Sequence, residues 1–148
     1  MARALGVDLG SRRIGLALSD PTGAVALPHR ILERSGDPAA DHRVIAAVAR
    51  EADADRIVVG LPLSLSGEVG PAARAVLDEV EALRAEVGEG MRVDTHDERL
   101  TTVIAEQGLR DAGVSGRRGR RVVDAAAATV MLQSYLDTPS LDAPSPPT

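Results

Sequence analysis

The stretch 4–19 reads ALGVDLGSRRIGLALS and contains two short apolar runs separated by a polar link. The apolar runs occupy residues 4–9 and 14–19, and residues 10–13 join them. Because a link this short connects neighbouring antiparallel strands, the stretch predicts a β-hairpin. The hairpin would place one carboxylate, Asp8, near the end of the first strand.

After the hairpin, strand and helix patterns alternate along the chain. The pattern predicts a strand at 24–32, a helix with Asp37 as cap and Pro38 at its first position, a strand at 56–60, a loop at 61–70, a helix from Pro71 to Gly88, a strand at 91–95, a helix at 100–112, a loop at 114–121 and a last helix at 122–136. An antiparallel meander followed by βα units predicts an α/β fold with a mixed five-stranded sheet and helices on both faces.

Length and composition fit one small domain. The chain has 148 residues, and we expect the domain to span 1–137, with a disordered proline-rich tail at 138–148. The absence of cysteine excludes a disulfide framework, a thiolate metal site and a cysteine nucleophile. No signal-peptide pattern and no apolar run of about 20 residues is found, so we expect a cytoplasmic protein without a membrane span.

Charge and aromatic content limit how a nucleic acid could be bound. The net charge of −5 by itself argues against a nucleic-acid binder. All 17 basic residues are arginine, the better phosphate ligand, although a GC-rich genome would give the same bias. Tyr135 is the only aromatic residue, so unpaired bases have no stacking platform. Any nucleic acid must therefore be held by its backbone and its shape.

Three carboxylates are candidates for a catalytic metal site. Asp8 lies near the end of the first strand, Glu98 follows the fifth strand, and Asp124 falls in the first turn of the last helix. In open α/β sheets the functional crevice lies beyond the carboxyl ends of the strands. Crowded carboxylates need a cation, and oxygen-only ligands suit Mg²⁺ or Mn²⁺. The alternatives are an Asx turn at Asp8 and favourable helix N-termini for Glu98 and Asp124.

Arginines near these carboxylates are candidates for binding phosphate. They are Arg12 and Arg13 in the hairpin link, Arg99 beside Glu98, and Arg117, Arg118, Arg120 and Arg121 in the glycine-containing loop before Asp124. The alternative for each is an ordinary solvated turn or loop.

Weaker candidates lie elsewhere. The segment 60–63 could present backbone N–H groups to a phosphate, or it could be a tight loop. His29, His42 and His96 lack ligand spacing and are interpreted as structural or surface residues, although His96 could assist proton transfer near Glu98.

Four segments together resemble one known family. They are GVDLGSRRIGLA at 6–17, VGLPL at 59–63 with Ser66-Gly67, DERLTT at 97–102 and DAAAA at 124–128. These segments are similar to the YqgF family, also called RuvX, of pre-16S rRNA nucleases that are also described as Holliday junction resolvases. The DERLTT block is the specific one, and the similarity covers about residues 4–136.

The resemblance implies a ribonuclease-H-like fold and two-metal hydrolysis of phosphodiester bonds, with Asp8, Glu98 and Asp124 as catalytic metal ligands. It implies a nucleic-acid partner, either rRNA precursor in an assembling ribosomal particle or branched DNA. Arginine replaces the lysine common in the family at positions 12 and 13 and within 117–121, which keeps the charge.

Two other classes of protein remain open at this stage. One is a nucleotide-binding domain of the actin and sugar-kinase superfold, because the segment 8–11 also resembles its phosphate loop. The other is a non-catalytic RNA- or ribosome-binding factor, which would have no need of three carboxylates. A junction resolvase would act as a symmetric dimer, and the sequence does not decide between monomer and homodimer.

Overall fold

The computed structural model describes residues 3–97 and 116–138. The elements are β1 (Arg3–Leu9), β2 (Arg13–Ser19), β3 (Ala26–Glu33), α1 (Pro38–Glu51), β4 (Ala54–Leu61), α2 (Pro71–Val87), β5 (Arg92–Asp97) and α4 (Gly116–Asp137). The side chains of 116–125 are not described. Within the described ranges, no helix is long and apolar enough to cross a membrane.

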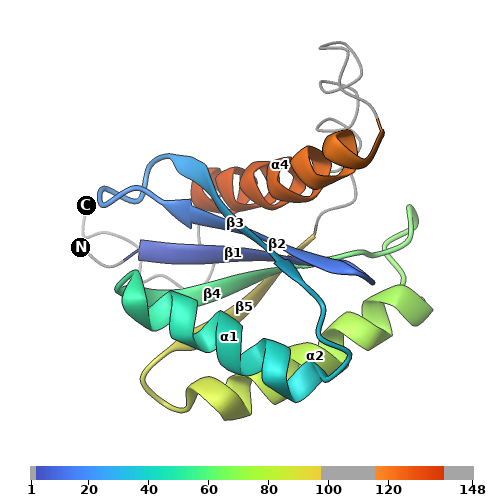
Figure 1. Cartoon of the computed structure of the whole chain (residues 1–148), viewed down its shortest axis with the longest axis horizontal. Coiled ribbons are helices and arrows are strands. Elements are labelled where there is room, and N and C mark those ends of the chain that lie inside the picture. Colours follow the sequence, from blue (N-terminus) through green and yellow to red (C-terminus); the bar gives the residue numbers. More distant parts are fainter. Residues whose placement is uncertain (1–2, 98–115, 139–148) are drawn as a thin grey trace.

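The strands form one mixed sheet in the order β3-β2-β1-β4-β5 (Figure 1). β1, β2 and β3 are joined as an antiparallel meander, whereas β4 and β5 run parallel to β1. The predicted hairpin and the predicted mixed five-stranded sheet are therefore confirmed. The three parallel strands end at the same edge, which we call the carboxyl edge.

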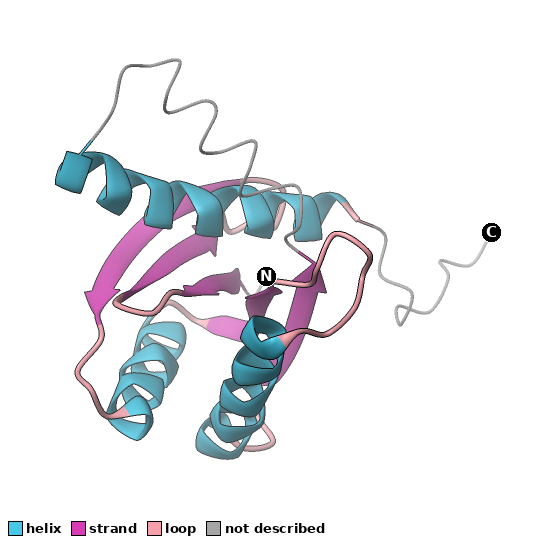
Figure 2. Cartoon of the chain, turned by 90° about the vertical axis from the view of Figure 1, so that its right-hand side faces the viewer, coloured by secondary structure: helices cyan, strands magenta, loops and turns pink. Residues whose placement is uncertain are grey.

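Helices cover both faces of the sheet, as predicted. α1 and α2 lie on one face and α4 crosses the other (Figures 1 and 2). β1 is buried on both sides because its residues alternate between the two layers. Leu5 and Val7 belong to the core under α1 and α2. Ala4 belongs to the core under α4.

The start of α1 follows from its sequence. The Asp37 side chain accepts a hydrogen bond from the backbone N–H of Ala39, and Pro38 occupies the first helical position. This cap satisfies one of the N–H groups that a helix leaves without a partner, and proline supplies the required φ. The predicted start of this helix is confirmed.

The last helix is longer than the sequence pattern predicts. α4 begins at Gly116, so the predicted loop at 114–121 is wrong for residues 116–121. Arginine is a good helix former and each glycine costs only about 1 kcal/mol, so a helix anchored by its packed C-terminal half can extend through this segment. The predicted helix at 100–112 and the tail beyond residue 138 lie outside the described residues.

Close packing of α4 on β1 occurs at Gly6. A Cβ atom at Gly6 would lie 2.9 Å from the Cβ of Leu132 and 3.4 Å from the carbonyl oxygen of Ala128. Real Cβ atoms do not approach another carbon that closely, so the distance between the helix and the strand requires glycine at this position.

We therefore predict that Gly6→Ala destabilises the protein. The added methyl must push α4 away from β1, at a cost of about 1–3 kcal/mol in the free energy of unfolding, measured by urea denaturation. Gly90→Ala is the matched control, because a Cβ there meets nothing within 4 Å. Equal stability of the Gly6→Ala variant and the wild type would show that α4 is not held at this distance.

Candidate functional site

Asp8 lies at the carboxyl edge of the sheet, on the face that α4 covers. Ala4 and Gly6 pack against α4, and strand alternation places Asp8, two residues beyond Gly6, on the same face. The Asp8 side chain is partly buried. The predicted position of this carboxylate near the end of the first strand is confirmed.

Glycines occupy the strand positions on both sides of Asp8. Its antiparallel partner on β2 is Gly15. On β4, Val59 is level with Val7, so Gly60 is level with Asp8, and His96 on β5 is level with Gly60. The two strand positions flanking the carboxylate therefore carry no side chain.

α4 runs antiparallel to β1, which determines where Asp124 lies along the sheet. Tyr135 lies near the C-terminal end of α4, and its hydroxyl donates to Asp94 and accepts from Arg56. Arg56 is paired with Ala4, at the beginning of β1, so this end of α4 lies over the strand starts. Asp124 precedes Ala128 by about one turn, and its backbone is thus displaced from Gly6 in the direction of Asp8.

The longer α4 changes the interpretation of Asp124. The sequence predicted Asp124 in the first turn of the last helix. This prediction is wrong, because α4 begins at Gly116 and Asp124 lies beyond its first turn. Attraction to the positive end of the helix dipole falls off within the first turn, so it does not account for an aspartate here.

The other two members of the predicted triad are Glu98 and Asp124. Glu98 and Arg99 lie outside the described residues, immediately after Asp97, the last residue of β5. The side chain of Asp124 is not described either. Among the side chains that the structure describes, no three carboxylates or histidines gather into a metal site. Asp8 is thus the member of the predicted triad whose side chain the structure describes.

His96 anchors α4 to the edge strand β5. Its Nε2 lies 2.9 Å from the hydroxyl of Ser134, and its ring meets the ring of Tyr135 edge to face, with centroids 5.9 Å apart. Burial lowers the pKa of His96 below its ordinary value, against the opposing charge of Asp97. The neutral ring is therefore favoured, and its described contacts are structural.

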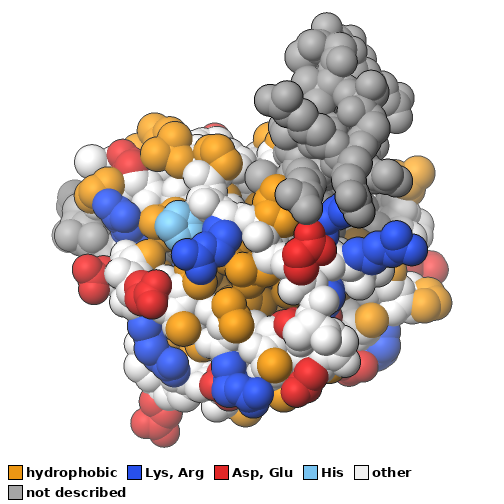
Figure 3. Space-filling model, in the orientation of Figure 1, with side chains coloured by type: hydrophobic (Ala, Val, Ile, Leu, Met, Phe, Trp, Pro, Cys, Tyr) orange, Lys and Arg blue, Asp and Glu red, His pale blue; other side chains and the backbone are white. Residues whose placement is uncertain are grey.

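The predicted phosphate-binding arginines fall into two groups. Arg12 is exposed at the tip of the turn, whereas Arg13 is largely buried, with its Nε 3.4 Å from the Glu33 carboxylate on β3. Arg117, Arg118, Arg120 and Arg121 all lie in α4, in place of the predicted loop. On the face shown in Figure 3, basic and acidic side chains are interspersed and do not form one basic patch.

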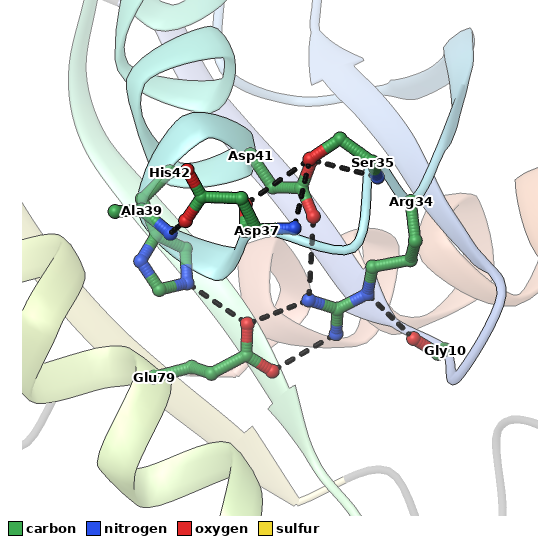
Figure 4. A network of polar contacts seen from close by, with 8 residues as sticks. All are labelled: Gly10, Arg34, Ser35, Asp37, Ala39, Asp41, His42 and Glu79. Atoms are coloured by element: carbon green, nitrogen blue, oxygen red, sulfur yellow. Dashed lines mark hydrogen bonds and ion pairs between the residues drawn. The ribbon is translucent and has the colours of Figure 1, made fainter.

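A polar network that the sequence pattern did not reveal lies between α1, α2 and the β1–β2 turn (Figure 4). The guanidinium of Arg34 donates to both carboxylate oxygens of Glu79, at 2.7 and 2.9 Å. The buried His42 lies 2.8 Å from the same carboxylate. Arg34 Nε also donates to the carbonyl oxygen of Gly10. The residues are far apart in the chain, so no local motif could have identified them.

The charges in this network stabilise one another. Burial alone would raise the pKa of Glu79, but hydrogen bonds from Arg34 and His42 outweigh burial and lower the pKa below its ordinary value of 4.5. The hydrogen bond with Glu79 raises the pKa of Arg34. The guanidinium therefore stays protonated, and its charge is balanced by that of the Glu79 carboxylate.

The strand order, the strand directions and the helices on both faces of the sheet define a ribonuclease-H-like fold. The chain has the same fold as RuvC from T. thermophilus, solved in complex with a Holliday junction substrate. The TM-score is 0.53 with 17% identity, over 93% of this chain and 97% of that one. At this identity the likeness concerns the fold alone.

The chain belongs to the RuvX family, described as Holliday junction resolvase, whose model matches residues 2–138. A relative from Nocardia farcinica is 45% identical over 91% of this chain and 77% of its own length. Another from Desulforudis audaxviator is 44% identical over 92% and 94%. Both carry the provisional name of pre-16S rRNA nuclease. The family resemblance noted in the sequence is thereby confirmed.

We predict that Glu79→Gln lowers the free energy of unfolding by about 1–3 kcal/mol at pH 7, because Arg34 loses its charged partner. The pKa of Glu79 is depressed on folding, so its contribution is present above the unfolded value of 4.5 and is lost as pH falls through the folded value. Urea denaturation should show the wild type losing its advantage over the variant as the medium is acidified below pH 4.5. A stability difference that does not change with pH would contradict this account.

Proposed function

We propose that this protein is a divalent-metal-dependent nuclease that hydrolyses phosphodiester bonds in the maturation of the 5′ end of pre-16S rRNA. The names of its relatives supply the substrate. The observation that carries the proposal is the position of Asp8: a partly buried carboxylate at the carboxyl edge, on the α4 face and between two glycine positions. A carboxylate that is partly buried against a helix layer needs a charged partner or a metal ion.

We propose Asp8, Glu98 and Asp124 as the metal ligands. All three offer carboxylate oxygens, a donor set that fits Mg²⁺ or Mn²⁺ and not a thiolate-bound metal. The antiparallel course of α4 supports this set, because it displaces the backbone of Asp124 towards Asp8. When bound, such an ion activates a water molecule and stabilises charge on the leaving oxygen.

The remaining task of the chain is to hold the substrate backbone. Tyr135, the only aromatic residue, contacts Asp94, Arg56 and His96, so it is committed to anchoring α4. Base stacking is thus not a binding mode for this protein. The proposed phosphate ligands are Arg12, Arg13, Arg99, Arg117, Arg118, Arg120 and Arg121, with Arg13 the weakest candidate because Glu33 contacts it.

A second candidate function is cleavage of four-way DNA junctions, which the description of the family favours. It requires two active sites related by symmetry, whereas rRNA maturation requires only one. A monomer therefore suits the first proposal and a homodimer the second. Both activities place the protein in the cytoplasm, and the first places it on a ribosomal precursor particle.

We predict that Asp8→Asn abolishes cleavage with the fold intact. Loss of a charged ligand should lower the rate at least about 100-fold. The assay compares labelled rRNA precursor, single-stranded DNA and a four-way junction, each with Mg²⁺, Mn²⁺ or EDTA. Asp78→Asn, an exposed aspartate on α2, is the matched control and should cut like the wild type. Undiminished cutting by Asp8→Asn would refute the role of Asp8.

We also predict that replacing Arg117, Arg118, Arg120 and Arg121 by glutamine weakens nucleic-acid binding and flattens its salt dependence. Each lost phosphate contact reduces the slope of log affinity against log salt by about 0.7–0.9. Glutamine at Arg43 and Arg74, exposed on α1 and α2, should leave the slope unchanged. An unchanged slope in the fourfold variant would show that the first turns of α4 do not contact phosphate.

A further inference from the structure

The β1–β2 turn, residues 10–12, is held in place by Arg34, which lies outside the turn. Inside the turn, the Gly10 N–H donates to the carbonyl oxygen of Arg13 at 2.9 Å. The turn is so tight there that a Cβ at Gly10 would lie 2.5 Å from that oxygen. The carbonyl oxygens of Gly10 and Arg12 accept from Arg34, through its side-chain Nε at 2.9 Å and its backbone N–H at 2.8 Å.

The guanidinium of Arg34 is itself held in place by acidic side chains of α1 and α2. Its two terminal nitrogens form the paired hydrogen bonds to Glu79 on α2, and Asp41 on α1 lies 3.9 Å from one of them. His42 holds Glu79 from the other side (Figure 4). The Arg34 side chain is only 17% exposed, so its cation faces protein carboxylates and is unsuited to binding phosphate.

The turn held in this way carries the exposed Arg12 and begins two residues after Asp8. The strand pair that contains Asp8 ends at Leu9 and Ile14, so the turn continues directly from it. A flexible turn would let the Arg12 guanidinium sample many positions, and each phosphate contact would then cost ordering entropy. Because the turn is already fixed, most of the entropy cost of ordering the protein backbone at Arg12 is absent when phosphate binds.

We propose that Arg34 is a positioning residue for substrate binding: it holds the β1–β2 turn so that Arg12 contacts a phosphate of the nucleic-acid backbone next to Asp8. This inference rests on the proposed function. Arg34 acts through Arg12 and does not contact substrate. Glu79 and His42 serve the same purpose one step further away, by fixing the guanidinium of Arg34.

Binding of a labelled rRNA-precursor segment in EDTA tests the proposal without cleavage. Arg34→Lys keeps the charge but cannot bond Gly10 and both oxygens of Glu79 together. We expect Arg34→Lys and Arg12→Gln each to weaken binding about five- to tenfold and to reduce the salt slope by about 0.7–0.9. The double variant should bind no more weakly than Arg12→Gln alone, because one contact is lost in all three. Arg74→Lys, on the exposed side of α2, should bind like the wild type.

Two results would overturn the proposal: affinity losses that multiply in the double variant, or an unchanged salt slope for Arg34→Lys. Either result is what an arginine with a merely structural role would give. If Arg34→Lys does not fold, Glu79→Gln loosens the same guanidinium and should give a smaller loss of the same kind. If the wild type binds and cuts RNA and Arg12→Gln binds equally well, this inference is overturned and the proposed function is not. A wild type that neither binds nor cuts any nucleic acid overturns the proposed function as well.

Discussion

The contact between α4 and β1 at Gly6 sets the distance between the helix layer and the sheet on the face that carries Asp8. With Leu132 and Ala128 this close, no side chain larger than hydrogen is accommodated on the strand. On the other face of β1, Leu5 and Val7 are buried in the core under α1 and α2. A strand fixed from both sides cannot shift its register without moving its apolar residues out of one core. The carboxylate two residues further along therefore stands on a strand that is packed on both faces.

A second constraint acts on the opposite face, beyond the end of the same strand. There Arg34, Glu79 and His42 join α1 and α2 to the β1–β2 turn through hydrogen bonds, with an ion pair between Arg34 and Glu79 at the centre. A partly buried ion pair contributes little to stability unless its geometry is good and its remaining polar atoms are satisfied. Here the guanidinium has a partner at each nitrogen, and the carboxylate has one at each oxygen. The strand carrying Asp8 and the turn that follows it are thus held by apolar packing on one side and by a polar network on the other.

These constraints suit a nuclease that recognises a charged backbone and not base identity. The chain has an acidic net charge and a single aromatic residue, which is engaged by Asp94, Arg56 and His96. In the function proposed above, arginines bind the nucleic-acid backbone and offset locally the repulsion between an acidic protein and a polyanion. Membership of the RuvX family and the ribonuclease-H-like fold agree with this chemistry.

By itself, the sequence determined the features that depend on neighbouring residues. The hairpin follows from the short link at 10–13, the start of α1 from Asp37 and Pro38, and the mixed sheet from the order of apolar runs. Long-range contacts decided the rest. Local glycines suggested a loop at 116–121, whereas the structure continues α4 through it, which moved Asp124 out of the first helical turn. Arg34 and Glu79 are 45 residues apart, and no local pattern relates them. The tertiary structure alone brings them together, because the two layers must pack before their charges can meet.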